Sequence, residues 1–421
     1  MKKYLMLTSL LLFSMAVTAQ EKEESKFGIK LSGFVKNDFF IDSRQTICAR
    51  EGHFLLWPSP QKLDANGNDI NSKSTFNMLA IQSRLSVNIT GPDAFGAKTS
   101  GLMEGDFFAQ ANDNINLFRM RHAYVKLNWT HFEALAGYTW NPLFVTDCFP
   151  GTVSFNTGAP LQSFARNPQF RFIYTAGNLK IIAAALSQID YTSRGVDGPN
   201  CKYLRNSTTP DVHLQIHYGV TNAETGKGFI IGGGMAYKSI VPRLESEISA
   251  DEIYQVDELV HGITAMAFSK ITTKAVTIKV QARYGENIAD VLAISGFGVK
   301  DITDPVTGEQ SYTPLKSMAY WGEIHTNGNP QVGLFGGVLI NNGTKEAMSD
   351  PANAVYGLAQ DIQSMFRISP RIVYNSGKVR LALEMEYTQA AYGEDYNEFY
   401  LPDRTVAVGN FRGLLAVYYF F

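Results

Sequence analysis

Apolar and polar residues alternate with a period of two in one segment after another along this chain. In the segment 84–89, Arg, Ser and Asn alternate with Leu, Val and Ile, and the same rhythm recurs at 212–218, 276–284 and 366–374. This pattern is typical of a β-strand with one apolar face and one face in contact with water. Since no helical pattern of comparable length competes with it, the sequence predicts an all-β protein.

The sequence predicts sixteen strands, and the links between them alternate in length. The strands are expected near residues 29–41, 77–89, 97–109, 117–129, 133–139, 169–175, 179–187, 211–218, 229–238, 259–269, 274–284, 317–326, 331–340, 363–374, 378–387 and 410–421. Short links such as those at 91–93 and 375–377 carry turn residues. Most of the other links are long, and they are expected at 42–76, 140–168, 188–210, 285–316, 341–361 and 388–409.

Long loops at one rim and tight turns at the other indicate a transmembrane antiparallel up-and-down β-barrel, with long extracellular loops and short periplasmic turns. A closed sheet gives every backbone N–H and C=O a partner inside the protein, as hydrocarbon requires. The alternative, a soluble β-sandwich or propeller, calls for a sharper core and no difference between rims. An even number of strands places both termini at the turn rim. Pro370 cannot donate to the strand ladder, so we expect it at a bulge or at a strand end.

The first residues have the features of a secretory signal peptide. Lys2 and Lys3 precede an apolar stretch that ends before a small residue at Ala19. We therefore expect a signal peptide at 1–19, a short segment without a plug domain at 20–26, and the outer-membrane barrel at 27–421. The exported chain has three cysteines, Cys48, Cys148 and Cys201, for which one disulfide with a free thiol and three free thiols are both open.

Composition and motifs exclude several classes of function. Without Lys2 and Lys3 the chain has 35 basic against 39 acidic residues, and so it has no basic excess for binding nucleic acid. The motifs G-x-S-x-G, H-E-x-x-H and C-x-x-C are absent, so we expect neither an enzyme nor a cofactor. The acidic loop from Asp64 to Asp69 lacks the glycine and the closing glutamate of a calcium loop. His213 and His217 lie about 13 Å apart on one strand, too far to share a metal ion.

Basic residues recur on the polar face of the predicted strands. Because a cation facing lipid at mid-depth costs about 2–4 kcal/mol, these side chains should face the lumen. Guanidinium groups bind carboxylates bidentately and bias a narrow pore toward anions. Alternatively, they pair with lumen carboxylates and brace the wall. The predicted pore-lining and substrate-binding residues are Arg84, Arg119, Arg121, Arg166, Arg171, Lys279, Arg283, Arg367, Arg371 and Arg380.

One stretch of the chain resembles a known family. The sequence G-Y-T-W at 137–140 is followed by F-P-G-T-V-S-F-N at 149–156 and by R-N-P-Q-F-R-F at 166–172, and L-F-R-M-R-H-A-Y-V precedes it at 117–125. This succession resembles the DcaP-like, dicarboxylate-uptake type of outer-membrane porin. The resemblance implies a sixteen-stranded trimeric porin in which loop three, here 141–168, folds into the lumen. Carried over by position, the residues near the constriction would be Arg119, Arg121, Arg166 and Arg171.

The sequence thus predicts a porin in the outer membrane of a Gram-negative cell that gives passive, anion-preferring diffusion of small solutes such as carboxylates. The expected partners are small anionic solutes, outer-membrane lipid and, from the resemblance, two further copies of the chain in a homotrimer. The alternative is an outer-membrane barrel that acts through its surface loops, as an adhesin, a receptor or a component of an import complex. A pore conducts in a planar bilayer, whereas a filled barrel does not.

Overall fold

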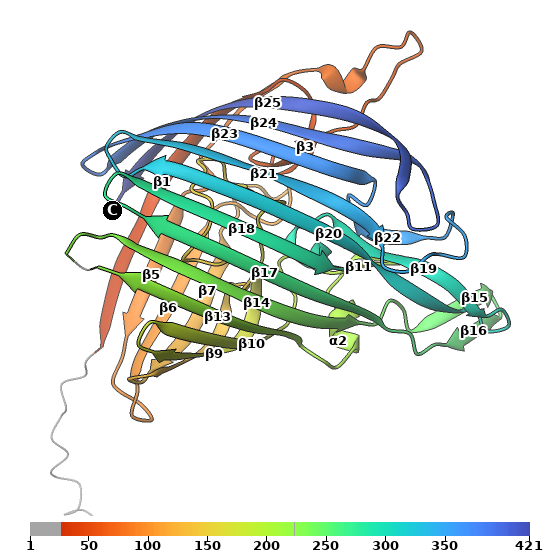
Figure 1. Cartoon of the computed structure of the whole chain (residues 1–421), viewed down its shortest axis with the longest axis horizontal. Coiled ribbons are helices and arrows are strands. Elements are labelled where there is room, and N and C mark those ends of the chain that lie inside the picture. The colour runs from red at the N-terminus through yellow and green to blue at the C-terminus, as the bar shows by residue number, and fades with distance from the viewer. Residues whose placement is uncertain (1–26, 223) are drawn as a thin grey trace, which may run out of the picture.

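The computed structural model describes residues 27–421 except residue 223. The predicted signal peptide at 1–19 and the segment 20–26 lie outside the described residues. The described chain forms an antiparallel sheet of 19 strands that closes where β1 pairs with β25. β4 and β5 both pair with β1 and form one barrel strand, while β19 and β22 pair with each other beyond the rim. The barrel itself therefore has sixteen strands, as predicted (Figure 1).

The barrel strands follow one another in sequence order around the wall. They are β1 (Gly28–Asp42), β4 (Thr75–Leu79) with β5 (Arg84–Thr90), β6 (Lys98–Asp106), β7 (Arg119–Asn128), β8 (Phe132–Trp140), β9 (Arg166–Ala176), β10 (Leu179–Leu186), β13 (Asp211–Thr221), β14 (Gly228–Ile240), β17 (Val260–Thr272), β18 (Val276–Glu286), β20 (Glu309–Thr326), β21 (Gln331–Thr344), β23 (Ile362–Ser376), β24 (Val379–Tyr396) and β25 (Pro402–Phe420).

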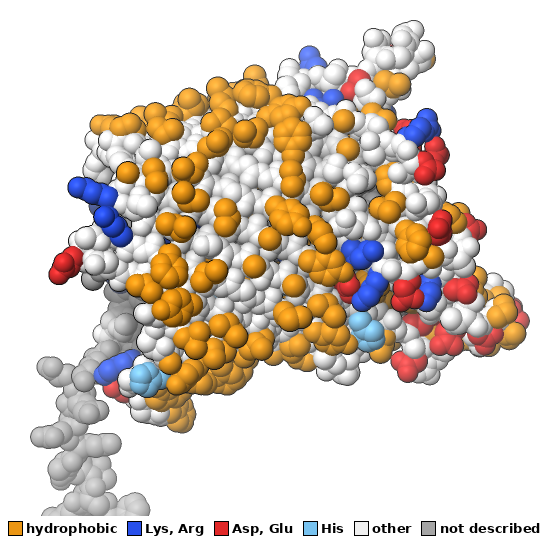
Figure 2. Space-filling view, viewed as in Figure 1, with side chains coloured by type: hydrophobic (Ala, Val, Ile, Leu, Met, Phe, Trp, Pro, Cys, Tyr) orange, Lys and Arg blue, Asp and Glu red, His pale blue; other side chains and the backbone are white. Residues whose placement is uncertain are grey.

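Apolar side chains cover the outside of this wall. Along β23, Phe366, Ile368 and Ile372 are exposed, whereas Arg367 and Arg371 between them are buried on the inner face. Figure 2 shows apolar side chains spread over the barrel between its two rims, with acidic side chains gathered at the loop end. This is the distribution that a wall surrounded by hydrocarbon requires, and it confirms the predicted alternation.

The two rims differ as predicted. At one rim the links are tight, and the last residue lies there too, with the N–H of Phe421 bonded to the C=O of Gly33 at 3.2 Å (Figure 1). The loops of the other rim carry short elements: β2 (Thr46–Ala49), β3 (Phe54–Pro58), η1 (Ile70–Ser72), β11 (Arg194–Gly195), β12 (Gly198–Pro199), α2 (Lys202–Asn206), β15 (Glu245–Ser249), β16 (Glu252–Gln255), η2 (Ala289–Val291), β19 (Ser295–Asp304) and β22 (Val355–Leu358). None of the helices in the described chain is both long and apolar enough to cross a membrane.

Two local predictions were wrong. The link expected at 388–409 is mostly strand, because β24 and β25 stay paired as far as Tyr396 and Pro402. Ala390, Tyr392 and Val408 of these strand ends face inward and belong to the hydrophobic core, so the alternation of apolar outer and polar inner residues is absent there. Pro370 lies in the middle of β23 rather than at an end or a bulge. The pairing of β23 with β24 is interrupted at Ser369 and Pro370 and then resumes in the same register.

The hydrophobic core lies inside the barrel. Its largest cluster joins Phe54 and Trp57 of loop one (43–74), the segment 143–165 of loop three and the segment 288–294 of loop six (287–308). The wall residues that complete it belong to β17, β20, β21, β23, β24 and β25, and Ile81 and Phe108 beside β5 and β6 also belong to it. Three loops thus fill the lumen beside these strands. Cys48, Cys148 and Cys201 are all free thiols.

Candidate functional site: loop three and the basic inner wall

Loop three, residues 141–165, leaves the end of β8 and crosses the interior of the barrel before β9 begins at Arg166. Its C=O at Phe149 accepts a hydrogen bond from Lys279 of β18 at 2.9 Å. Its N–H groups at Val153 and Ser154 donate to Glu384 of β24 at 2.6 and 3.1 Å. Since β18 and β24 are distant from β8 in the barrel order, the structure places the segment predicted as loop three within the lumen, against the opposite wall.

Four of the predicted basic residues hold loops to that wall. Arg367 is 1% exposed and donates to the C=O of Ala159 at 2.6 Å and of Leu56 at 2.5 Å, and so it binds loops three and one together. Arg283 donates to the hydroxyl of Ser163 at 2.7 Å. Arg371 and Lys279 both pair with Glu323 of β20, at 3.0 and 3.2 Å. These four side chains form contacts within the protein that fix the loops.

Loop one is folded inward as well. His53 lies 2.5 Å from the carboxylate of Asp38 on β1, and Arg412 of β25 donates to the C=O of Gly52 at 2.7 Å. The hydroxyl of Tyr392 donates to the C=O of Pro58 at 2.7 Å. Burial of the His53 ring lowers its pKa, because the charged imidazolium loses its hydration there.

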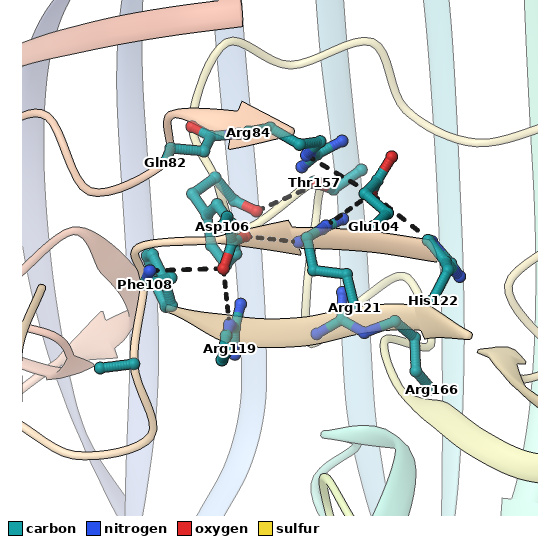
Figure 3. Close-up of polar contacts among 12 residues, drawn as sticks. Gln82, Arg84, Glu104, Asp106, Phe108, Arg119, Arg121, His122, Thr157 and Arg166 are labelled. Carbon is teal, nitrogen blue, oxygen red and sulfur yellow. Dashed lines mark hydrogen bonds and ion pairs between the residues drawn. The ribbon is translucent and has the colours of Figure 1, made fainter. Parts of the chain in front are cut away.

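Three more predicted arginines surround two carboxylates on β6 (Figure 3). Asp106 is fully buried and accepts hydrogen bonds from Arg119 at 2.8 Å and from Arg121 at 2.9 Å. Glu104 pairs with Arg121 at 2.9 Å and with Arg84 at 3.5 Å. The guanidinium of Arg119 also lies 4.6 Å from the ring centre of Phe108. Arg121 therefore links both carboxylates, while Arg119 binds Asp106 alone.

The remaining three predicted arginines have different surroundings. Arg166 is buried, pairs with Asp190 of loop four (187–210) at 2.9 Å and stacks on Trp140. Arg171 donates to the side chain of Gln169 at 2.9 Å and to the C=O of Trp140 at 2.6 Å. Within the described chain no carboxylate lies within 4.0 Å of Arg171. Arg380 donates to Asn375 near the turn rim at 2.8 Å and lies over aromatic rings of β25.

A cavity of about 600 Å³ lies between loop three and the inner face of β5 to β10. Loop three contributes Phe149, Phe155 and Thr157 to its lining. The basic residues that line it are Arg84, Arg121, Lys126, Arg171 and Lys180, and the acidic ones are Glu104, Glu133 and Asp147. A second cavity of about 510 Å³ at the turn rim shares Asp147 and Lys180 with the first, so the two adjoin.

Two of these cations, Lys126 and Lys180, were missed in the sequence. A β-bulge at Arg121 shifts the register between β6 and β7, so that both Arg121 and His122 are buried. Beyond the bulge the even positions face inward, and Lys126 with them. No pattern in the sequence predicts this bulge. On β10 both faces are apolar apart from Lys180, so alternation does not indicate which face is inner.

In the described part of the chain no group of three or more His, Cys, Asp or Glu side chains could hold a metal ion. The Asp64 carboxylate instead accepts the N–H groups of Asn66 and Asn68, both at 2.8 Å, which stabilises its own turn. His213 lies beside Asp211 at 3.0 Å and His217 beside Gln215 at 3.1 Å.

Residues 57–224 match the family model described as DcaP outer membrane protein, which confirms the resemblance seen in the sequence. The chain is similar to the outer membrane channel DcaP of Acinetobacter baumannii, with a TM-score of 0.68 and 16% identity over 94% of this chain and 97% of that one. It is similar to the anion-selective porin from Comamonas acidovorans, with a TM-score of 0.55 and 11% identity over 94% and 100%. The trimer form of OmpT of Vibrio cholerae gives a TM-score of 0.50 and 10% identity over 94% and 99%. No curated protein sequence matches the chain.

Proposed function

We propose that this β-barrel is an outer-membrane porin of the DcaP type, through which small anionic solutes such as carboxylates diffuse passively. The observation that carries this proposal is the cavity beside β5 to β10, which five basic and three acidic side chains line. It adjoins the cavity at the turn rim and so extends the route toward the periplasmic end. Solutes would pass on this side of loop three.

The local charge of this cavity supports anion preference even though the chain as a whole is slightly acidic. A water-filled passage with low-dielectric walls concentrates the field of the charges that line it. Charges on the distant outer loops are screened over about 8 Å at physiological salt. Arg171 contributes most by this argument, because its hydrogen-bond partners are neutral and Glu133, the carboxylate that attracts it in the same cavity, forms no ion pair with it.

The ten predicted residues divide into groups under this proposal. Arg84, Arg121 and Arg171 line the passage, and Lys126 and Lys180 join them. Arg380 lines a separate, smaller cavity at the turn rim beside β23 to β25, away from this passage. The others position loops or neighbouring side chains, and they are Arg119, Arg166, Lys279, Arg283, Arg367 and Arg371.

We also propose that the porin works as a homotrimer surrounded by outer-membrane lipid. The apolar outer wall supports contact with lipid and with other copies of the chain (Figure 2). The structural similarity to OmpT of Vibrio cholerae, of which a trimer form is known, supports the same assembly. Native mass spectrometry of the protein in detergent should give three times the mass of one chain, and a monomer under all mild detergents would contradict it.

The porin function is tested by recording single channels in a planar bilayer across a salt gradient. Stepwise conductance with a reversal potential that favours chloride over potassium is expected, most clearly at low salt. Cation selectivity would overturn the anion preference.

A second candidate function has its own supporting observation. The lumen beside β17 to β25 is filled by a hydrophobic core of three loops, as in a barrel that acts through its surface loops rather than as a pore. Such a protein would serve as an adhesin, a receptor or a component of an import complex. Absence of conductance steps from folded protein would favour this candidate.

A further inference from the structure

One buried carboxylate holds the tip of loop three without a cation beside it. Glu384 on the inner face of β24 is 1% exposed and accepts the N–H groups of Val153 and Ser154, one on each oxygen. Within the described chain no Lys, Arg or His nitrogen lies within 4.0 Å of its carboxylate. Its negative charge is therefore stabilised in contact only by the amides of the loop.

The two other carboxylates that bind this loop do have cations. Glu323 accepts the N–H of Gly151 and pairs with Arg371 and Lys279, at 3.0 and 3.2 Å. Glu386 accepts the side-chain amide of Asn156 at 3.0 Å and pairs with Arg367 at 3.2 Å. An adjacent cation favours the ionised carboxylate, whereas burial without one favours the neutral acid. Of these three carboxylates, Glu384 is the one whose protonation no paired cation opposes.

We propose that Glu384 is a positioning residue that sets the width of the passage: as a carboxylate it holds the tip of loop three firmly against β24, and when protonated it loosens the tip. A carboxylate can accept both N–H groups, whereas a protonated acid turns an O–H toward one of them. This inference rests on the proposed pore function, because it assigns a role to the loop that borders the passage.

The geometry gives the direction of the effect. Phe149, Phe155 and Thr157 flank the tip at 151–154 and line the cavity on the side away from Glu384. While the tip is held at β24, Phe149 and Thr157 stay back from the wall of β5 to β10, whereas Phe155 already stacks on Phe108 beside β6, with ring centres 3.9 Å apart. Loosening allows the loop to move into the cavity, so conductance should fall as the pH is lowered.

Other titratable and charged groups surround Glu384, and most are paired. They are Glu386 on β24 with Arg367 on β23, Arg371 on β23 with Glu323, Arg412 with Asp42 across β25 and β1, Lys36 with Asp38 on β1, and His53 of loop one. Lys36 also donates to the C=O of Val153 at 3.2 Å and keeps one contact with the tip when Glu384 is protonated. The tip should therefore loosen rather than leave. A proton taken up by His53 would act in the same pH range, so the test must separate the two groups.

The first measurement is channel conductance from about pH 7 down to about pH 4, the range in which carboxyl groups and histidine titrate. Glu384→Gln keeps the shape but offers one acceptor and a competing N–H donor. We expect this variant to show low conductance already at neutral pH and little further change in acid, while Glu384→Asp retains an acid step. Glu245→Gln, the same chemical change on exposed β15, serves as the matched control and should behave as the parent protein. Persistence of the full acid step in Glu384→Gln would assign it to His53 and overturn the proposal.

The second measurement does not depend on conduction, because Cys148 is a reporter within loop three itself. Its thiol is fully buried, with its sulfur 3.5 Å from the C=O of Ser269. In a Cys48→Ser, Cys201→Ser background, Glu384→Gln should let maleimide label Cys148 about tenfold faster at constant pH, as expected for the loss of one hydrogen bond to a charged group. Heat-modifiable migration in gels confirms folding of each variant. An unchanged labelling rate would show that Glu384 does not hold the tip of loop three, even if the parent protein fails to conduct. Faster labelling with unchanged conductance would show that Glu384 holds the tip but does not set the width of the passage.

Discussion

Basic side chains lie on both sides of the inner wall, but their surroundings differ between the two sides. Along β17 to β25 they are buried against loops one and three and take part in a packed interior. Along β5 to β10, Arg84, Arg121 and Arg171 border a cavity of about 600 Å³, whereas Arg119 and Arg166 are buried in ion pairs. Arg367, between two loop carbonyls, and Arg171, facing the cavity with neutral partners, illustrate the contrast. An inward-facing arginine in a barrel is therefore a pore residue only where no loop covers it.

The largest loss of stability should come from a substitution along β17 to β25, the side of the barrel that the loops fill. Arg367→Ala removes the donor to Ala159 and Leu56 and leaves Glu386 buried without its cation. Removal of one partner of a buried ion pair costs about 3–5 kcal/mol. We expect a lower midpoint of urea unfolding in lipid vesicles and faster proteolysis of loop one. Arg380→Ala at the turn rim, which loses one hydrogen bond to Asn375, is the matched control and should cost about 1 kcal/mol. Equal losses in the two variants would break the distinction between the filled and open sides.

This contrast also explains which features could be read from the sequence. The sixteen strands and the long-loop rim follow from alternation and turn residues, because hydrocarbon and water act on the two faces of each strand separately. The partners of the arginines depend on which loop fills the lumen, and alternation contains no information about that. Lys126 could not be predicted for a further reason. The bulge at Arg121 exchanges the positions of β7 that face inward and outward along the rest of the strand.

On the open side, the geometry of the wall at Gly137 depends on the close contact between β8 and β7. Gly137, the first residue of the G-Y-T-W motif, has φ of 138°, and a Cβ there would lie 2.3 Å from the C=O oxygen of Ala123 on β7. Gly137→Ala should therefore cost about 1–3 kcal/mol. Gly177 has φ of 58° but open space around it, so Gly177→Ala should cost about 1 kcal/mol from strain alone. Urea unfolding of both variants measures the difference, and equal costs would show that the contact with β7 relaxes freely.

Replacement of Arg171 should change the ion selectivity of the pore at only a small cost in the stability of the barrel. Because its partners are neutral, Arg171→Ala leaves no carboxylate unpaired and should cost only its two hydrogen bonds, about 1–2 kcal/mol in unfolding free energy. The loss of one charge near a solute in water amounts to about 1 kcal/mol, or about a fivefold fall in the chloride-to-potassium permeability ratio. Reversal potentials of the variant measure this ratio. Lys98→Ala, which removes an exposed lysine paired with Asp93 outside the cavity, should leave the ratio unchanged. An unaltered ratio in Arg171→Ala would place the passage elsewhere in the lumen.

The smallest effect should be confined to loop five (241–259), above the filled side. Glu258 accepts hydrogen bonds from Arg243 at 2.8 and 2.9 Å and from the hydroxyl of Tyr312 at 2.7 Å. Burial alone would raise the pKa of Glu258, but these donors outweigh it and lower the pKa below its usual range. A carboxyl with a lowered pKa stabilises the fold above its unfolded pKa, and this contribution is lost as the pH falls through the folded value.

Hydrogen–deuterium exchange at 245–255, corrected for the intrinsic effect of pH, should therefore quicken in acid while the barrel strands keep their protection. Glu258→Gln should give the faster exchange already at neutral pH, because an amide cannot accept both nitrogens of Arg243. If exchange in this variant matched that of the parent protein at neutral pH, the ion pair would not be what holds the loop, and the apolar contacts beneath it would have to account for its order.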